Sequence, residues 1–369
     1  MTEFDHINLD QTSRALICKA CHDSPRVWLS PLDKGLSGSS VWLAQWQLVG
    51  GGRSKYHVFK IGNKRKLQAE YQNVVDIASV LIQGFPLMTL HDHSRSNIAL
   101  LRQEFVGGPS GAPKSLRQFL NECSDTNVIK KTFRRLYLEV MASWYTESAE
   151  VPNSGDVTTS LGNAMDRWVA KINLPAAARE IGHAELDKSL RRYFRTGLAD
   201  MEARIRLLCR LREEIRVGPV HGDLHAQNVL VDPKGGLHLI DFGWTDFRWR
   251  LVDFIMMECS LKFVVSPAHA QLQDLIELER LLDKSWGMES TANFTGLKKL
   301  LHGKKIVGIA EAIGIIRSCA RKCRAVRDKE QYRRGLILLT AALSSIPTLI
   351  NRVFLFHSLG YHLAAIRGR

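Results

Sequence analysis

The chain has 369 residues, more than a single hydrophobic core usually holds, and it shows no internal repeat and no low-complexity segment. Its 51 Lys and Arg residues outnumber the 37 Asp and Glu residues, which gives a formal net charge of +14. A protein of this charge is poorly suited to a polycationic ligand. An anionic ligand, a nucleic acid or an acidic protein suits it better.

Residues 1–24 are expected to form an N-terminal extension. Residues 1–6 lack the basic start and the apolar stretch of a signal peptide, so we expect a cytoplasmic protein. Cys18, Cys21 and His22 have the spacing of a c-type haem attachment motif, which is used in exported proteins. Because cysteines of a cytoplasmic protein are mostly reduced, buried and apolar in character, we expect neither haem nor zinc here.

A turn rich in glycine and serine at 32–40 leads into an alternating strand at 41–48. Small residues let backbone N–H groups approach phosphate oxygens, so this turn is a candidate phosphate-binding loop. An ordinary hairpin turn has a similar composition, and the order of the later motifs decides between the two interpretations. The candidate residues are Gly35, Ser37, Gly38, Ser39 and Ser40.

The next strand, at 56–61, is apolar apart from one lysine, Lys60. A buried lysine is costly unless it is paired. The following segment, 64–82, has the apolar spacing of a helix and carries Glu70, ten residues after Lys60. We therefore predict an ion pair between Lys60 and Glu70.

A further strand at 98–106 runs into a cluster of Gly and Pro at 107–111, which is typical of a domain boundary or hinge. A small strand-rich lobe is therefore expected at 25–106 and a large, mainly helical lobe at 107–369. The loop 151–161 is the best candidate for a mobile segment. Apolar spacing predicts long helices at 128–145, 185–214, 268–285, 303–327 and 332–357.

Two features of the helical lobe have alternative interpretations. The most apolar run, 336–350, is 15 residues long and therefore too short to cross a bilayer, so we expect a core helix and no transmembrane segment. Cys319 and Cys323 lie four residues apart on a predicted helix. A zinc site there is the alternative to two buried thiols, which we favour.

The most informative run lies between His221 and Gly243. Asp223 precedes Asn228 by five residues, and two apolar strands joined by a Gly-rich turn then lead to Asp241. Phosphoryl transfer from a magnesium nucleotide needs a group that orients the attacking hydroxyl and hard oxygen ligands for Mg²⁺. In this layout one carboxylate can orient the hydroxyl, and two further side chains supply oxygen ligands for Mg²⁺. The run therefore indicates a kinase.

The string HGDLHAQN at 221–228 and the Asp-Phe-Gly at 241–243 resemble the aminoglycoside phosphotransferase/choline kinase-like family of the protein kinase-like superfamily. Protein kinases typically carry Arg and Lys where Gly222 and His225 stand. The resemblance covers about residues 30–255. It implies an α+β, two-lobe protein kinase-like fold, in which one lobe is a small antiparallel β-sheet with one helix and the other is large and mainly helical.

The resemblance also implies a role for each central residue, with ATP and Mg²⁺ as cofactors. Lys60 would contact the nucleotide phosphates, and Glu70 would orient Lys60. Asp223 would act as the catalytic base, while Asn228 and Asp241 would bind Mg²⁺.

Five further residues are implied in binding or support. The main-chain groups of Glu104 and Val106 would bind the adenine edge. Asp253, a short way past the metal-binding aspartate, would brace the catalytic loop through backbone N–H groups or through His221. His225 would be a further supporting residue of that loop.

Three functions fit these features. We favour an ATP-dependent phosphotransferase that phosphorylates a hydroxyl of a small molecule, and not of an aminoglycoside, because aminoglycosides are polycations. The alternative is a kinase-like nucleotide-binding module that binds partners in a bacterial complex. A protein kinase comes third, since the ten residues from Gly243 to Asp253 are too few for a peptide-binding activation segment.

Basic residues gather at 130–135, 191–195 and 317–334 of the expected helical lobe. They form either solvated helix faces or a surface for an anionic ligand or an acidic protein. Nucleic acid is not favoured, because no basic motif is interleaved with aromatic residues.

Overall fold

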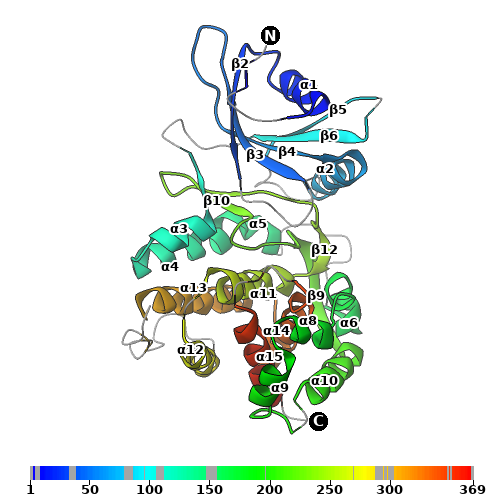
Figure 1. Cartoon of the computed structure of the whole chain (residues 1–369), viewed down its shortest axis with the longest axis vertical. Helices are drawn as coiled ribbons and strands as arrows, with labels where there is room; N and C mark the ends of the chain where they lie inside the picture. Colours follow the sequence, from blue (N-terminus) through cyan, green and yellow to red (C-terminus); the bar gives the residue numbers. More distant parts are fainter. Residues whose placement is uncertain are drawn as a thin grey trace. The chain divides into compact units, whose positions relative to one another are not determined.

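The computed structural model describes most of the chain and divides it into two compact units (Figure 1). Unit 1 comprises residues 1–116 and 227–246, and unit 2 comprises residues 117–226 and 247–369. The described residues are 3–4, 9–32, 39–78, 86–94, 96–104, 112–146, 156–195, 197–268, 270–286, 294, 297, 303–346, 349 and 351–366.

Unit 1 is built on a six-stranded sheet of order β1-β2-β3-β4-β6-β5. The pairs from β2 to β5 are antiparallel, whereas β1 runs parallel to β2. The sheet strands are β1 (Glu3–Phe4), β2 (Arg26–Pro31), β3 (Ser40–Trp46), β4 (His57–Asn63), β5 (Met88–Asp92) and β6 (Ile98–Glu104). The unit also contains helices α1 (Gln11–Ala20) and α2 (Lys64–Ala78), and a second sheet of order β11-β10-β7 formed by β7 (Lys114–Ser115), β10 (Val229–Val231) and β11 (Leu237–Leu239).

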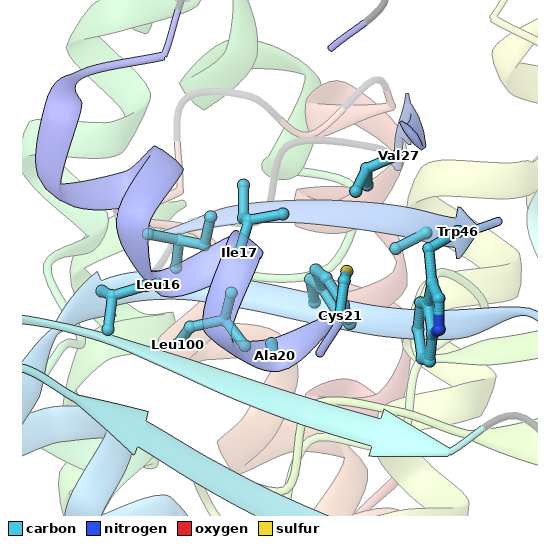
Figure 2. Close-up of a cluster of buried hydrophobic side chains, with 10 residues drawn as sticks. Leu16, Ile17, Ala20, Cys21, Val27, Trp46 and Leu100 are labelled. Carbon is cyan, nitrogen blue, oxygen red and sulfur yellow. The ribbon is translucent and has the colours of Figure 1, made fainter. Parts of the chain in front are cut away.

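Helix α1 belongs to the core of unit 1. Its residues Leu16, Ile17 and Ala20 are buried, and they pack in one apolar cluster with Trp46 of β3 and Leu100 of β6 (Figure 2). Burying several large side chains contributes about 1.5–3 kcal/mol for each. Residues 11–20 are therefore part of this unit, whereas the sequence had suggested a separate extension over 1–24.

The cysteine run lies at the end of α1. Cys21 is buried in the same cluster, and burial raises the pKa of its thiol to about 12. Such a thiol resists the deprotonation that metal ligation requires. Among the described residues, no group of three or more His, Cys, Asp or Glu side chains is placed to hold a metal ion. The absence of zinc and haem stays a prediction.

The hairpin β10–β11 packs against the large sheet of unit 1. Leu230 and Ile240 of the hairpin region share an apolar cluster with Leu43 and Val58 of β3 and β4. The side chain of Gln103 donates a hydrogen bond of 2.5 Å to the carbonyl of Leu239. The segment that carries Asn228 and Asp241 thus belongs to unit 1, which differs from the predicted division that puts every residue after 106 in the helical lobe.

Unit 2 is mainly helical, with one three-stranded sheet of order β12-β9-β8. Its strands are β8 (Asp156–Ser160), β9 (Arg212–Val220) and β12 (Asp246–Trp249). Its helical segments, of which η1 and η2 are π-helical, are α3 (Leu116–Glu122), α4 (Thr126–Arg135), η1 (Leu136–Val140), α5 (Ala142–Tyr145), α6 (Leu161–Ala164), α7 (Asp166–Val169), α8 (Leu174–Glu180), α9 (His183–Leu190), α10 (Leu198–Arg210), α11 (Leu251–Ser260), η2 (Leu261–Val265), α12 (Leu272–Lys284), α13 (Gly303–Lys322), α14 (Lys329–Leu343) and α15 (Arg352–Ala365). Within the described ranges, none of the helices has both the length and the apolar character needed to cross a membrane.

The predicted fold class is confirmed, with α1 as an additional helix, but two long helices were predicted wrongly. The expected helix 185–214 breaks into α9, α10 and the start of β9. Gly197 adopts φ +57°, and the Asp187 carboxylate accepts a hydrogen bond of 3.0 Å from the N–H of Leu198, which stabilises the start of α10. The expected helix 332–357 likewise separates into α14 and α15. Across the first break the buried residues Leu190, Phe194, Leu198 and Met201 keep a helical spacing, so the sequence pattern gives no sign of the break.

Candidate active site

Lys60 and Glu70 meet because a strand leads directly into a helix. Lys60 lies on β4, where it pairs with Val41 of β3 and Leu101 of β6, so its side chain leaves the middle of the sheet. Helix α2 begins right after β4 and buries Glu70 in its second turn. Lys60 Nζ lies 2.7 Å from Glu70 Oε2, and both side chains are buried. The predicted ion pair is confirmed.

Asp241 joins this pair from the end of the β10–β11 hairpin. Its Oδ1 lies 2.6 Å from Lys60 Nζ, and Glu70 Oε1 accepts a hydrogen bond of 3.1 Å from the N–H of Phe242. Asp241 has φ +63°, in the left-handed region where a residue other than glycine is strained. Its side chain is 20% exposed, against 9% for Lys60. The carboxylate is therefore held in one orientation while part of it stays accessible to a cation.

The charges of this cluster are coupled. Burial alone would lower the pKa of Lys60, but the carboxylates of Glu70 and Asp241 outweigh it and raise that pKa above its ordinary value. Burial raises the pKa of Glu70, and Lys60 acts against that shift. Lys60 is thus held as a cation at a buried position, which is the state needed to bind phosphate oxygens.

Asn228 and Asp241 lie at the same end of the hairpin. Val229 pairs with Leu239, and the carbonyl of Asn228 accepts a hydrogen bond of 3.0 Å from the N–H of Ile240. The carboxylate of Asp241 and the carboxamide of Asn228 therefore belong to neighbouring positions of two paired segments. Hard oxygen donors of these two kinds fit Mg²⁺.

The turn of the hairpin is stabilised by its own side chains. Asp232 accepts hydrogen bonds of 2.8 Å from the N–H groups of Lys234 and Gly236, and Gly235 has φ +79°. This turn fixes the register between β10 and β11, and so the pairing of the segments that carry Asn228 and Asp241.

The predicted phosphate-binding turn and adenine contacts are described only in part. Ser40 begins β3, and Ser39 lies against Gly62, where an added Cβ would stand 2.4 Å from Ser39 Oγ. The backbone N–H of Glu104 donates a hydrogen bond of 2.8 Å to the carbonyl of Leu87. Gly35, Ser37, Gly38, Val106 and the expected hinge at 107–111 lie outside the described residues.

Unit 2 holds the loop that carries Asp223. Gly222 adopts φ +78°, a conformation that favours glycine, and Asp223 directly follows it half-buried. Asp253 lies at the start of α11 and is fully buried. Its two carboxylate oxygens accept hydrogen bonds of 2.9 Å from the N–H of His221 and 2.8 Å from the N–H of Gly222. The predicted bracing contact of Asp253 with the backbone of this loop is present.

The sequence did not indicate two other supports of this loop. Tyr145 donates a hydrogen bond of 2.8 Å from its hydroxyl to Asp253 Oδ2, and Ser260 Oγ accepts one of 3.1 Å from the N–H of Ala226. Neither residue stands in a motif. His225 Nε2 lies 3.7 Å from Asp223 Oδ2, beyond ordinary hydrogen-bond distance.

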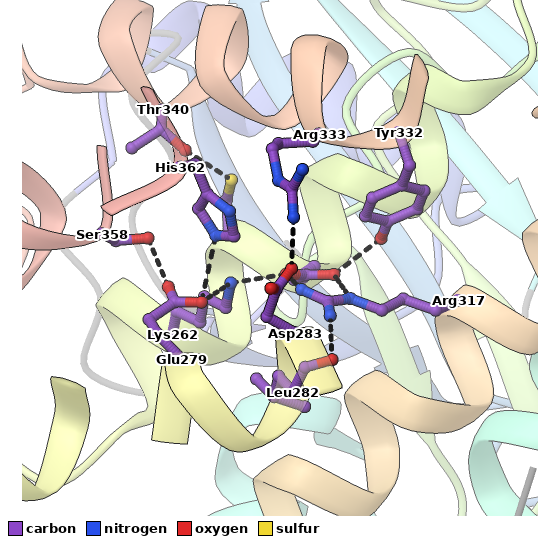
Figure 3. Close-up of polar contacts among 12 residues, drawn as sticks. Lys262, Glu279, Leu282, Asp283, Arg317, Tyr332, Arg333, Thr340, Ser358 and His362 are labelled. Atoms are coloured by element: carbon purple, nitrogen blue, oxygen red, sulfur yellow. Dashed lines mark hydrogen bonds and ion pairs between the residues drawn. The ribbon is translucent and has the colours of Figure 1, made fainter. Parts of the chain in front are cut away.

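The basic run at 317–334 is largely internal to unit 2. Arg317 is buried and binds Glu258 through two nitrogens, at 2.9 and 2.6 Å (Figure 3). Arg333 and Lys329 both contact Asp283, at 2.6 and 3.0 Å. Arg334 pairs with Glu213 of β9. These four side chains, and Arg327 beside Asp328, balance carboxylates of the same unit, so the run is a weaker candidate docking surface than its sequence suggests.

Several solved structures resemble this chain in fold. An aminoglycoside phosphotransferase, APH(4)-Ia, solved as a thermostable mutant with ADP and hygromycin B, matches 97% of this chain and 100% of its own, at 12% identity and a TM-score of 0.50. Spectinomycin phosphotransferase APH(9)-Ia matches at 12% identity and a TM-score of 0.43, covering 95% of this chain and 94% of its own. Choline kinase LicA from Streptococcus pneumoniae matches at 16% identity and a TM-score of 0.37, covering 90% and 98%.

The chain thus has the protein kinase-like fold of aminoglycoside phosphotransferases, as the resemblance implied. A family model described as ternary complex associated domain 9 matches residues 153–347, more than half of the sequence, and the chain belongs to that family. No curated protein matches the chain.

Proposed function

We propose that the chain is an ATP-dependent phosphotransferase that transfers the γ-phosphoryl group to a hydroxyl of a small molecule. The observation that carries the proposal is the contact of one buried lysine with two carboxylates, Glu70 at 2.7 Å and Asp241 at 2.6 Å. Lys262 of unit 2 also contacts two carboxylates, those of Glu258 and Glu279, but both of them are buried. The partly exposed carboxylate of Asp241 suits a cation that accompanies a phosphate ligand.

In this proposal Lys60 binds phosphate oxygens of ATP, and Glu70 fixes the position of Lys60. Asp241 and Asn228 are the residues that would hold Mg²⁺. The metal, when bound, neutralises charge on the phosphates. The left-handed backbone at Asp241 supports this assignment, because strained residues gather at ligand sites.

Asp223 is the proposed catalytic base, which would orient the acceptor hydroxyl and take its proton. The hydrogen bonds of Asp253 to His221 and Gly222 hold the backbone on the N-terminal side of Asp223, and Ser260 holds it at Ala226. A base fixed in this way suits a reaction whose rate depends on positioning. Ser39, Ser40 and the carbonyl of Glu104 are further proposed contacts of the nucleotide.

The proposed acceptor is not an aminoglycoside, although two of the similar solved structures are named for such substrates. An aminoglycoside is polycationic, and the chain carries a formal charge of +14. That field would repel the acceptor instead of steering it to the site.

A second function is favoured by the family description. The words "ternary complex associated" support a chain that works within a multi-protein assembly, where nucleotide binding would regulate contacts between partners. The two functions differ in whether bound ATP is consumed.

The test is a titration with magnesium ATP by calorimetry, followed by incubation with radiolabelled ATP and fractionated metabolite pools. Binding together with a labelled acceptor supports the phosphotransferase. Binding without transfer to any fraction supports the assembly function and rejects the first proposal. Lys60→Met is the control for the binding step. If this variant and the wild-type protein bind magnesium ATP with equal affinity, both the phosphotransferase proposal and the assembly proposal are rejected.

A further inference from the structure

Unit 2 contains a cavity of about 190 Å³ that none of the proposed catalytic residues lines. It lies where β9 faces the turn between α13 and α14. Its volume is below the roughly 300–1,000 Å³ of sites that take drug-sized ligands. The polar residues that line it are Glu214, Arg216, Arg324, Arg327 and Gln331.

The lining side chains carry an excess of positive charge. Three of the lining residues are arginines and one, Glu214, carries a carboxylate, so the lining as a whole has a formal charge of +2. Arg327 also lies 3.3 Å from the exposed Asp328, and a pair of this kind at the surface contributes little. Guanidinium groups bind phosphoryl oxygens through paired hydrogen bonds, and three of them around a small cavity favour a phosphorylated anion.

Arg324 follows the end of α13, at the position where a Schellman motif usually has glycine. The N–H of Ala325 donates to the carbonyl of Ala320 (2.8 Å) and that of Arg324 to the carbonyl of Arg321 (3.0 Å), which is the Schellman pattern that ends α13. Arg324 occupies the left-handed position of this motif, with φ +51°. An arginine is strained there and a glycine is not, so the sequence places a guanidinium at the cavity at a cost in stability.

Gln331 holds the two walls of the cavity together. Its side-chain nitrogen donates a hydrogen bond of 2.7 Å to the carbonyl of Glu214 on β9, and its oxygen accepts one of 2.8 Å from the N–H of Arg327. Gln331 is buried, with 2% of its surface exposed. The backbone that carries the arginines is therefore fixed before any ligand binds, which lowers the entropic cost of binding.

We propose that this cavity is a binding site for a small phosphorylated anion, with Arg216, Arg324 and Arg327 as its ligands. The site is separate in sequence from Lys60, Asn228, Asp223 and Asp241, and it goes beyond the proposed phosphotransfer. The ligand carries one or two phosphoryl groups, because the cavity holds a group of that size and not a whole nucleotide.

The test is calorimetric titration of the full chain with inorganic pyrophosphate, in the absence of Mg²⁺ and at constant ionic strength. Arg324→Gly is expected to weaken binding by about ten- to a hundredfold, as the loss of a charge-assisted hydrogen bond implies. The same variant should keep or raise the midpoint of thermal unfolding, because glycine suits the left-handed position. Glu214→Gln should tighten binding several-fold, since it removes the one carboxylate among the lining side chains.

The matched control is Arg321→Ala, which removes one positive charge from the exposed last turn of the same helix but does not line the cavity. Binding by this variant should stay within about twofold of the wild-type value, the change expected of an exposed, screened charge that does not contact the ligand. Absence of saturable binding by the wild-type chain would overturn the proposal. Equal weakening by Arg324→Gly and Arg321→Ala would overturn it too, because the effect would then be one of net charge.

Discussion

Lys60 Nζ lies 2.7 Å from Glu70 Oε2, and both groups are buried in unit 1. Glu70→Ala leaves the lysine with Asp241 alone and removes the acceptor of the Phe242 N–H. We expect this change to lower the free energy of unfolding by about 3 kcal/mol, because Lys60 loses one of its two counter-charges and the buried Phe242 N–H loses its acceptor. Urea denaturation measures the loss.

The control for Glu70→Ala is the double variant Lys60→Met/Glu70→Leu, which replaces both charges with apolar side chains of similar size. It should recover part of the lost stability, because no buried lysine remains to be paired, although the Phe242 N–H still lacks its acceptor. It should still bind magnesium ATP poorly. A loss below about 1 kcal/mol for Glu70→Ala would contradict the view that this pair is energetically coupled.

This pair also marks what the sequence allows one to predict. A single lysine in an apolar strand, followed by a helix with one glutamate in register, is a local pattern, and local patterns specify local contacts. The predicted Asp253 contact came instead from the family resemblance, because no local pattern links Asp253 to the His221 N–H, 32 residues away. Tyr145 reaches Asp253 from 108 residues away and carries no motif, so no periodicity could have revealed it.

The basic run at 317–334 was harder to interpret for the same reason. Arg317 finds Glu258 across 59 residues, and Arg334 finds Glu213 across 121. The sequence shows the charge of each residue but not which helices pack together, so internal ion pairs and a free basic surface look alike. The break between α9 and α10 was missed because Gly197 interrupts a pattern whose apolar period continues.

The carboxylate of Asp253 is predicted to be a structural support of the loop before Asp223. Asp253→Ala removes the acceptor of two backbone N–H groups at a fully buried position, and an unsatisfied buried donor costs about 1–3 kcal/mol. We expect a loss of about 3–5 kcal/mol in chemical denaturation. Tyr145→Phe removes one donor and leaves both backbone contacts, so it should cost about 1 kcal/mol. Equal losses for the two variants would contradict the assignment.

Acid should destabilise unit 2 through Glu258. Burial would raise the pKa of this carboxyl, but Arg317 and Lys262 outweigh it and lower the pKa to about 2 from an ordinary 4.5. The folded state therefore binds the proton less readily than the unfolded state. The resulting stabilisation is complete above pH 4.5 and is lost as the pH falls toward 2. A shift of this size corresponds to about 3 kcal/mol.

Unfolding by urea at a series of pH values between 6 and 3 tests this prediction. The matched variant is Glu258→Gln, which keeps the shape of the side chain and cannot titrate. Its stability should be lower at pH 6, because Arg317 and Lys262 lose a counter-charge, and should change less with pH than that of the wild-type chain. Parallel pH profiles for both proteins would show that other groups cause the acid sensitivity.

The proposed roles of three polar groups in phosphotransfer predict an order of effects. Asp241→Ala should weaken magnesium ATP binding most, because it removes the carboxylate that would hold the metal against the phosphate charge. Asp223→Asn should leave nucleotide binding nearly intact and lower turnover by about 10²–10⁴-fold, the contribution of a positioned general base. Asn228→Ala should fall between them in binding, since it removes one neutral oxygen ligand while Asp241 is retained.

The order follows from charge and from what each group would contact. A carboxylate on the metal affects the bound state, whereas a carboxylate at the acceptor hydroxyl affects the chemical step, so calorimetry and single-turnover rates separate the two. Metal dependence gives a second readout, because the apparent affinity for Mg²⁺ should fall for Asp241→Ala and stay constant for Asp223→Asn. Loss of magnesium ATP binding in Asp223→Asn, with normal binding in Asp241→Ala, would mean that the two aspartates have been assigned the wrong way round.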